Sequence, residues 1–244
     1  MRTAAVYKWA KDVGGAVVQS DGTVRWRSTK MAAGEDDHAV VATALRLAAT
    51  SGGTAVGLTI GDGDASWALA RGLTATTCIG DVPGMIDEAS TAYALAAAVR
   101  AGEIDVVLVG DAEEHLGMGA ALAGHLGWPA LAGVLSASAS DGCVEAVRRT
   151  GDLDETVAVQ TPVVLMISAT AAEPKAPGMK ELLAARKRPV EMVTTTELGV
   201  EVQDTVTAHG TRVPEVTAAR LFTGDPTQAA AQLIAALRTE GVLR

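Results

Sequence analysis

Residues 106–129 constrain the fold more than any other part of the chain. They open with the apolar run 106–109, which has no polar alternation and therefore predicts a parallel strand buried on both faces. A loop with glycines follows, and then an alanine-rich helix that is predicted to end at Gly127. Strand, glycine-bearing loop and helix in this order are typical of the ligand crevice of an open α/β sheet, where a helix N-terminus favours an anion such as phosphate. The expected chemistry is binding and not bond-breaking.

The rest of the chain alternates strands and helices with a repeat of about 30 residues, the length of a βα unit. The pattern predicts strands at 3–6, 55–60, 75–79, 106–109 and 163–167, and helices at 38–49, 65–71 and 86–101. A fourth helix is predicted to follow residues 116–119 and to run to about 126. Three shorter apolar runs separated by glycine turns, at 131–136, 143–148 and 156–160, predict antiparallel strands that continue the sheet. The predicted fold class is therefore α/β, a doubly wound and mostly parallel sheet of the Rossmann-like, adenine-nucleotide-binding type, with antiparallel strands and a C-terminal arm.

The arm is expected to begin after residue 172, so that 1–172 form the α/β domain and 173–244 the extended arm. Two prolines in 173–178 exclude regular structure there. A basic helix, a short strand, a polar tail and a last helix are predicted at 179–188, 190–193, 197–214 and from 226 onwards. Asp225 as N-cap and Pro226 at the first helical position mark the start of that last helix. Its apolar face consists of Ala230, Leu233, Ile234 and Leu237, so the arm is expected to grip another chain.

Composition excludes several classes of function. The net charge of -9 and the pI near 4.9 argue against nucleic acid or an anionic membrane as the principal partner. The two cysteines, Cys78 and Cys143, lie far apart without a CxxC spacing and predict neither a disulfide framework nor a metal site. No signal-peptide core follows Met1 and no apolar run approaches the length of a membrane helix, so we expect a cytoplasmic protein without membrane insertion.

A set of motifs recurs in the order and spacing of one known family. They are Lys8 and Asp12, residues 44–47, 122–123 and 126–129, then Arg148, Glu155 and 162–164, and finally 173–175, 179–191 and 224–226. In these motifs the chain resembles the beta subunit of electron transfer flavoproteins, the FixA family, over nearly its whole length. The most specific part of the resemblance is the arm from 173 to 191, which resembles the family's Glu-Pro-Arg, helix start and lysine-rich run.

The resemblance implies a heterodimer with an alpha subunit that holds a redox-active FAD, and electron transfer from a flavin-dependent dehydrogenase to an acceptor. The beta chain has no catalytic residues of its own in this family, and usually holds AMP, or a second FAD in bifurcating relatives. The implied cofactor-binding residues are Val6, Lys8, Ile60, Gly61, His115, Leu116, Gly117, Met118 and Gly119. The implied partner-recognition residues are Met179, as the apolar anchor, with Lys180, Leu182, Leu183, Arg186 and Lys187.

The sequence departs from the family in two places near the expected nucleotide. The family's polar, Asp-rich loop corresponds here to residues 112–119, where only the last glycine agrees and Glu113 and Glu114 add negative charge that opposes phosphate. The first-helix motif, Asn-Pro-aromatic-acidic-Glu in the family, is Gly-Glu-Asp-Asp-His at 34–38 and lacks both the proline and the aromatic residue that approaches the partner's flavin. AMP, FAD or no nucleotide therefore all remain open for this site.

Two other classes of function remain open as well. One is a divergent adenine-nucleotide-binding module that serves as a sensor or scaffold without a redox role. The other is an enzyme that acts at the crevice with Lys8 and His115. The simpler interpretation of His115 is a solvent-facing loop histidine, and that of the basic run 186–188 is a solvated helix end.

Overall fold

The computed structural model describes residues 1–28, 30–61, 63–82, 87–111, 116–140, 142–172, 176–202, 206, 215 and 219–243. The chain divides into two compact units. The first consists of Met1–Val17 and Trp26–His209, and the second of Val18–Arg25 and Gly210–Arg244. No helix in the described part of the chain is long and apolar enough to span a membrane.

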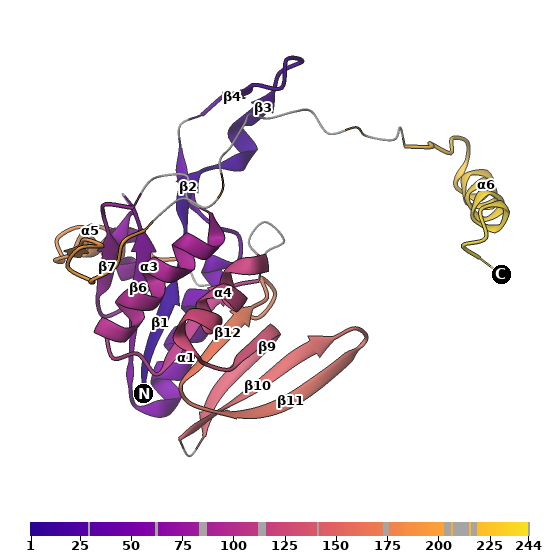
Figure 1. Cartoon of the computed structure of the whole chain (residues 1–244). Helices are drawn as coiled ribbons and strands as arrows, with labels where there is room; N and C mark the ends of the chain where they lie inside the picture. Colours follow the sequence, from indigo (N-terminus) through magenta and orange to yellow (C-terminus); the bar gives the residue numbers. More distant parts are fainter. Residues whose placement is uncertain are drawn as a thin grey trace. The chain divides into compact units, whose positions relative to one another are not determined.

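Nine strands of the described residues form one sheet in the first unit (Figure 1). Neighbouring strands from β9 through β12, β8, β1, β6 and β7 to β13 are parallel, whereas β10 is antiparallel to β9 and β11 to β10. The predicted α/β fold with added antiparallel strands is therefore confirmed. The strands are β1 (Arg2–Val6), β6 (Thr54–Ile60), β7 (Thr76–Ile79), β8 (Val106–Gly110), β9 (Ala130–Ser140), β10 (Cys143–Thr150), β11 (Leu153–Gln160), β12 (Val163–Ile167) and β13 (Glu191–Val193).

Helices cover both faces of the sheet, because the central strands bury side chains on both sides. In β8, Val106 and Leu108 join the core beside α1 (Asp37–Ser51) and α2 (Ala65–Ala70). Val107 and Val109 join the opposite core beside α3 (Glu88–Ala101) and α4 (Leu116–Leu126) (Figure 1). This alternation follows from the two-residue period of a strand, so the continuous apolar run of β8 required a layer of helices on each side.

Helix α3 is buried to different degrees in its two halves. In the first half Ala89 and Tyr93 are exposed. The second half of α3 is instead buried almost all round, because it lies against the sheet on one side and against α4 on the other. Small alanine side chains permit this close approach on two sides.

Part of the predicted arm belongs to the first unit. The basic helix, expected at 179–188, is α5 (Met179–Ala185), and β13 after it pairs in parallel with β7 at the edge of the sheet. Between them Arg188 donates from Nη1 to the carbonyl oxygen of Leu73 at 3.1 Å, and from Nη2 to that of Thr74. The boundary after residue 172 stays a prediction, and most of the polar tail expected at 197–214 lies outside the described residues.

The described residues also form two small two-stranded sheets. One joins β2 (Trp9–Lys11) to β5 (Met31–Ala33) in antiparallel pairing, and the other joins β3 (Ala16–Val18) to β4 (Val24–Trp26).

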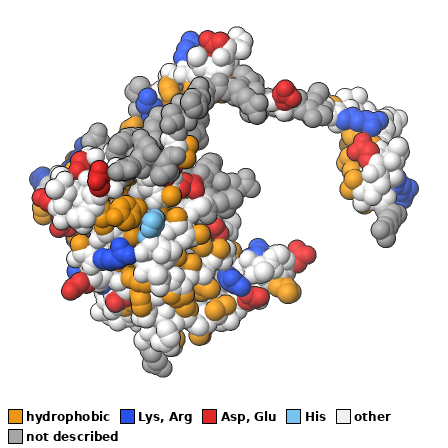
Figure 2. All heavy atoms as spheres, viewed as in Figure 1, with side chains coloured by type: hydrophobic (Ala, Val, Ile, Leu, Met, Phe, Trp, Pro, Cys, Tyr) orange, Lys and Arg blue, Asp and Glu red, His pale blue; other side chains and the backbone are white. Residues whose placement is uncertain are grey.

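The terminal helix of the second unit is α6 (Pro226–Thr239). As predicted, Asp225 caps it by accepting hydrogen bonds from the backbone N–H groups of Thr227 and Gln228, at 2.9 and 3.1 Å. No residue of α6 is buried, and Leu233 and Ile234 are 44% and 43% exposed. Figure 2 shows hydrophobic side chains along one side of this helix.

The two-sided core predicts a large difference between two leucines. Leu165 in β12 is fully buried and Leu153 at the start of β11 is 69% exposed. Leu165→Ala is expected to lower the free energy of unfolding by about 2–5 kcal/mol through lost burial and a cavity. Leu153→Ala, the matched control, is expected to change it by less than about 0.5 kcal/mol. Urea unfolding followed by circular dichroism measures both, and equal effects of the two substitutions would contradict the two-sided core.

Candidate functional site at the carboxyl ends of the parallel strands

The strand order reverses direction between β1 and β8, and we call the region outside the carboxyl ends of these two strands the crevice. From β1 the chain winds outward through β6 and β7 on one side, while β8 and β12 lie on the other. In open α/β sheets ligands bind at such a switch point, outside the carboxyl ends of the strands. Here the residues that leave the sheet at this point are Tyr7 and Lys8 after β1, and Asp111 after β8.

Asp37, the first residue of α1, ties that helix to the end of β1. Its buried Oδ2 accepts a hydrogen bond from the backbone N–H of Lys8 at 2.8 Å and another from that of Gly34 at 2.7 Å. Burial raises the pKa of the Asp37 carboxyl to about 6, although the two N–H donors favour its charged form. The start of α1 is thus held by a carboxylate in the crevice.

Asp36 brings a second carboxylate to the same place. The residue is only 5% exposed, and its Oδ2 has no hydrogen-bond partner among the described residues. A Cβ at Gly110, the last residue of β8, would lie 2.6 Å from that oxygen. Glycine at the carboxyl end of β8 therefore makes room for the Asp36 carboxylate.

The first turn of α4 carries the glycines that the sequence singled out. Gly119 is buried, and a Cβ there would overlap the side chain of Met166 in β12, so this glycine lets α4 pack closely on the sheet. Met118 is partly buried against the same core. A Cβ at Gly117 would overlap Oε2 of Glu88, the first residue of α3. A carboxylate thus lies beside the N-terminal turn of α4.

The other predicted cofactor residues meet at the same edge of the sheet. Val6 is buried and Ile60 is partly buried against the core under α3 and α4, at the ends of the neighbouring strands β1 and β6. Gly61 follows with a φ of 74° and donates its N–H to the carbonyl oxygen of Ile79 at 2.8 Å. The Lys8 side chain is exposed. Whether these residues contact a cofactor stays a prediction.

The positions of two predicted cofactor-binding side chains are not described. His115 lies outside the described residues, and so does the side chain of Leu116. The structure therefore gives no test of the histidine as a ligand or proton donor.

An aromatic cluster that the sequence did not predict lies beside this crevice. The ring of Trp67 lies 5.2 Å from that of Tyr7, 6.4 Å from that of Trp9 and 5.2 Å from that of His38, between ring centroids. The guanidinium of Arg71 lies 4.1 Å from the Trp67 ring centroid. Burial and the charge of Arg71 lower the pKa of His38, which favours a neutral imidazole. The available signal was the spacing of Tyr7 and Trp9 in a chain with only 3% aromatic residues.

On the other side of β8, Asp111 supports the bulge of β9. Its Oδ2 accepts the backbone N–H of Gly133 at 2.8 Å, and Gly133 has a φ of 67°. A Cβ at that glycine would lie 2.8 Å from the carbonyl oxygen of Arg149 in β10. The loop residue Asp111 is therefore engaged in shaping the sheet.

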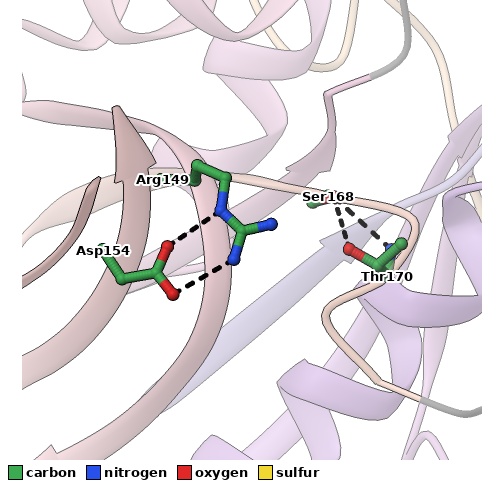
Figure 3. A network of polar contacts seen from close by, with 4 residues as sticks. All are labelled: Arg149, Asp154, Ser168 and Thr170. Carbon is green, nitrogen blue, oxygen red and sulfur yellow. Dashed lines mark hydrogen bonds and ion pairs between the residues drawn. The ribbon is translucent and has the colours of Figure 1, made fainter. Parts of the chain in front are cut away.

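Polar side chains also gather at the ends of β10, β11 and β12 (Figure 3). Arg149 in β10 pairs with Asp154 in β11 through two hydrogen bonds, Nε to Oδ1 at 2.8 Å and Nη2 to Oδ2 at 3.1 Å. The hydroxyl groups of Ser168 and Thr170 lie 3.1 Å apart in the turn after β12. The Arg149 and Asp154 side chains are exposed, and exposed pairs of this kind contribute little to stability.

Four of the six predicted recognition residues lie on α5, which has two distinct sides, and Arg186 and Lys187 directly follow its end. Leu182 packs with Ala185 against α2, so the inner side of α5 is anchored. Met179 and Leu183 are 71% and 52% exposed on α5. The basic residues Lys180, Arg186 and Lys187 are exposed as well.

The described residues at this edge bring negative charge to the place where a nucleotide phosphate would be expected. Asp36, Asp37 and Glu88 bring carboxylates to the end of β1, the end of β8 and the start of α4. At an effective dielectric constant of about 20, two like unit charges about 4 Å apart repel by about 4 kcal/mol. No group of acidic, histidine or cysteine residues in the described part of the chain is arranged to hold a metal ion that would offset this charge.

The fold and this edge of the sheet define a Rossmann-like α/β protein with a carboxylate-rich switch point. Residues 27–198, from the end of β4 to the turn after β13, match the model of the electron transfer flavoprotein domain. Since this match covers more than half of the chain, the protein belongs to the electron transfer flavoprotein domain family. The members of this family are electron carriers.

The raised pKa of Asp37 predicts a pH-dependent stability. Between about pH 4 and pH 6 the folded chain keeps a proton on Asp37 that the unfolded chain releases, so stability falls as the pH rises through this window. Because asparagine does not titrate, Asp37→Asn is expected to reduce the decrease in the free energy of unfolding between these pH values by up to about 3 kcal/mol. The measurement is the free energy of unfolding against pH for both proteins.

The control for this prediction is Asp152→Asn, at an exposed turn residue. It is expected to keep the pH dependence of the unsubstituted protein. An Asp37→Asn profile that equals the unsubstituted one above and below pH 6 would contradict the role of burial at Asp37.

Proposed function

We propose that the chain is the beta subunit of a heterodimeric electron transfer flavoprotein. In this proposal it carries electrons from a flavin-dependent dehydrogenase to an acceptor through FAD that the alpha subunit mainly holds. The observation that carries the proposal is α5, a helix inside the family match with an anchored inner side and exposed apolar residues outside. The protein's own work is then to position cofactors and partners, with the redox chemistry left to the flavin.

The anchoring of α5 supports a docking role. Leu182 packs on α2, and Arg188 donates to two backbone carbonyls before β7. An anchored helix loses little conformational entropy when a partner binds it. Met179 is unbranched and adaptable, which suits an anchor that enters a pocket on a dehydrogenase. Exposed Lys180 and Lys187 favour an acidic rim on that partner.

The terminal helix supports an obligate partner. Leu233, Ile234 and Leu237 fall on one side of α6 at helical spacing, and none of them is buried. Helices with an apolar face of this kind are stabilised mostly by packing. We therefore assign α6 to the interface with the alpha subunit.

The rival interpretations have less support. A nucleotide-binding sensor or scaffold would need a phosphate at the crevice, where three carboxylates oppose it. An enzyme that uses Lys8 and His115 has no described site geometry to support it.

Met179→Glu is expected to reduce the electron-transfer rate from the donor dehydrogenase by at least about tenfold, since a charge replaces the apolar anchor. The heterodimer and its flavin are expected to remain. Stopped-flow reduction of the purified heterodimer measures the rate. Leu153→Glu, at an equally exposed leucine outside α5, is the control and should leave the rate unchanged. A normal rate for Met179→Glu would overturn the recognition assignment.

The paired substitution Leu233→Asp with Ile234→Asp is expected to prevent heterodimer formation on co-expression with an alpha subunit, because both charges fall on the apolar side of α6. Size-exclusion chromatography and the yellow colour of the complex are the readouts. Ala231→Asp is the control, since Ala231 is exposed but lies outside that apolar row. A yellow heterodimer formed by the paired variant would contradict the assignment of α6.

A further inference from the structure

We propose that the crevice between β1 and β8 excludes nucleotide phosphate, and that Asp36 is the residue that chiefly determines this exclusion. The inference rests on the proposed function only in that this family context would lead one to expect a nucleotide here. It is argued from the buried carboxylates at the crevice.

One carboxylate oxygen of Asp36 lacks a hydrogen-bond partner among the described residues. This oxygen, Oδ2, is buried as well. An ionised carboxylate offers only acceptors, and so do the oxygens of a phosphate dianion. The two groups cannot satisfy each other, and both lose their hydration when they are buried together. Oδ2 of Asp36 thus requires a hydrogen-bond donor, which a phosphate dianion does not supply.

Two backbone N–H donors of the kind that a phosphate normally uses are already engaged in this crevice. Backbone N–H groups at strand ends and loops form the usual cradle for phosphate. In this crevice the N–H groups of Lys8 and Gly34 both donate to Asp37, at 2.8 and 2.7 Å. Two donors next to the end of β1 are therefore already used by a carboxylate of the chain itself.

A carboxylate of the chain lies at the start of α4. The free N–H groups and the dipole of a helix N-terminus attract negative charge. The Glu88 carboxylate lies so close to Gly117 that a Cβ there would overlap it. The chain thus supplies its own negative charge at the position where a phosphate is expected.

The space at the end of β8 also disfavours a phosphate. Gly110 has no side chain, and the room that this leaves at the end of β8 is taken up by Asp36. A phosphate would have to displace Asp36 from a site where the residue is 5% exposed. The rearrangement would also disturb Asp37, the next residue and the first of α1.

The first experiment uses the full chain co-purified with an alpha subunit. The complex is denatured, and the released small molecules are quantified by mass spectrometry. We expect FAD without AMP. AMP in an amount equal to the protein would overturn the inference, and so would a second FAD, because it carries a pyrophosphate. If no alpha subunit co-purifies and neither FAD nor AMP is released, the proposed function is overturned, but the exclusion of phosphate is supported.

The second experiment tests Asp36 itself. Calorimetric titration with AMP compares the unsubstituted protein, Asp36→Asn and the control Asp152→Asn, which removes the same charge at an exposed position. Asp36→Asn is expected to raise AMP affinity by at least about tenfold, and Asp152→Asn to leave it unchanged. Equal affinity for all three proteins, or an equal gain in both variants, would overturn the role of Asp36.

Folding is checked for every variant by thermal unfolding. Glu88→Gln alone is the second variant, because Glu88 is less buried than Asp36 and lies outside α1. If Asp36→Asn fails to fold, a gain in AMP affinity for Glu88→Gln supports exclusion by the crevice carboxylates. No gain for Glu88→Gln in that case overturns it.

Discussion

Burial of the central strands on both faces is the constraint on which the rest of the structure depends. Val106 to Val109 alternate between the core under α1 and the core under α3 and α4, and β12 does the same. Such a strand is stable only if helices cover both faces, and right-handed crossovers then deliver each connecting loop to an edge of the sheet. The crevice between β1 and β8, with its charged residues, is a consequence of this packing.

The charges at that edge decide what the crevice accepts. Asp37 stabilises the junction of β1 and α1 by accepting two backbone N–H groups, and Asp36 is drawn into the same enclosed place. Among the described residues, a fold of the nucleotide-binding type is thereby combined with a switch point that is rich in carboxylates. The same architecture serves many chemistries, so the side chains at the edge, and not the sheet, determine the ligand.

The apolar surfaces divide between the two units in a way that suits a carrier. In the first unit α5 is anchored by Leu182 and Arg188 and exposes Met179. In the second unit α6 is capped by Asp225 but buries none of its residues. A protein that positions a flavin between partners requires surfaces of this kind, whereas an enzyme working alone has no need of them.

By itself the sequence determined the order of strands and helices, the two-sided core and the cap of α6, because each depends on residues within a few positions of one another. Apolar periodicity and capping residues carry that local information. Only the tertiary structure decided that Trp67 meets Tyr7 and His38, that β13 joins β7, and that Glu88 lies beside Gly117. These contacts join residues far apart in the sequence. The hydrogen bonds of Asp37 cannot be predicted from residue types either, because their donors are backbone N–H groups. Physically, local patterns report burial, whereas a site is made where separate strand ends converge.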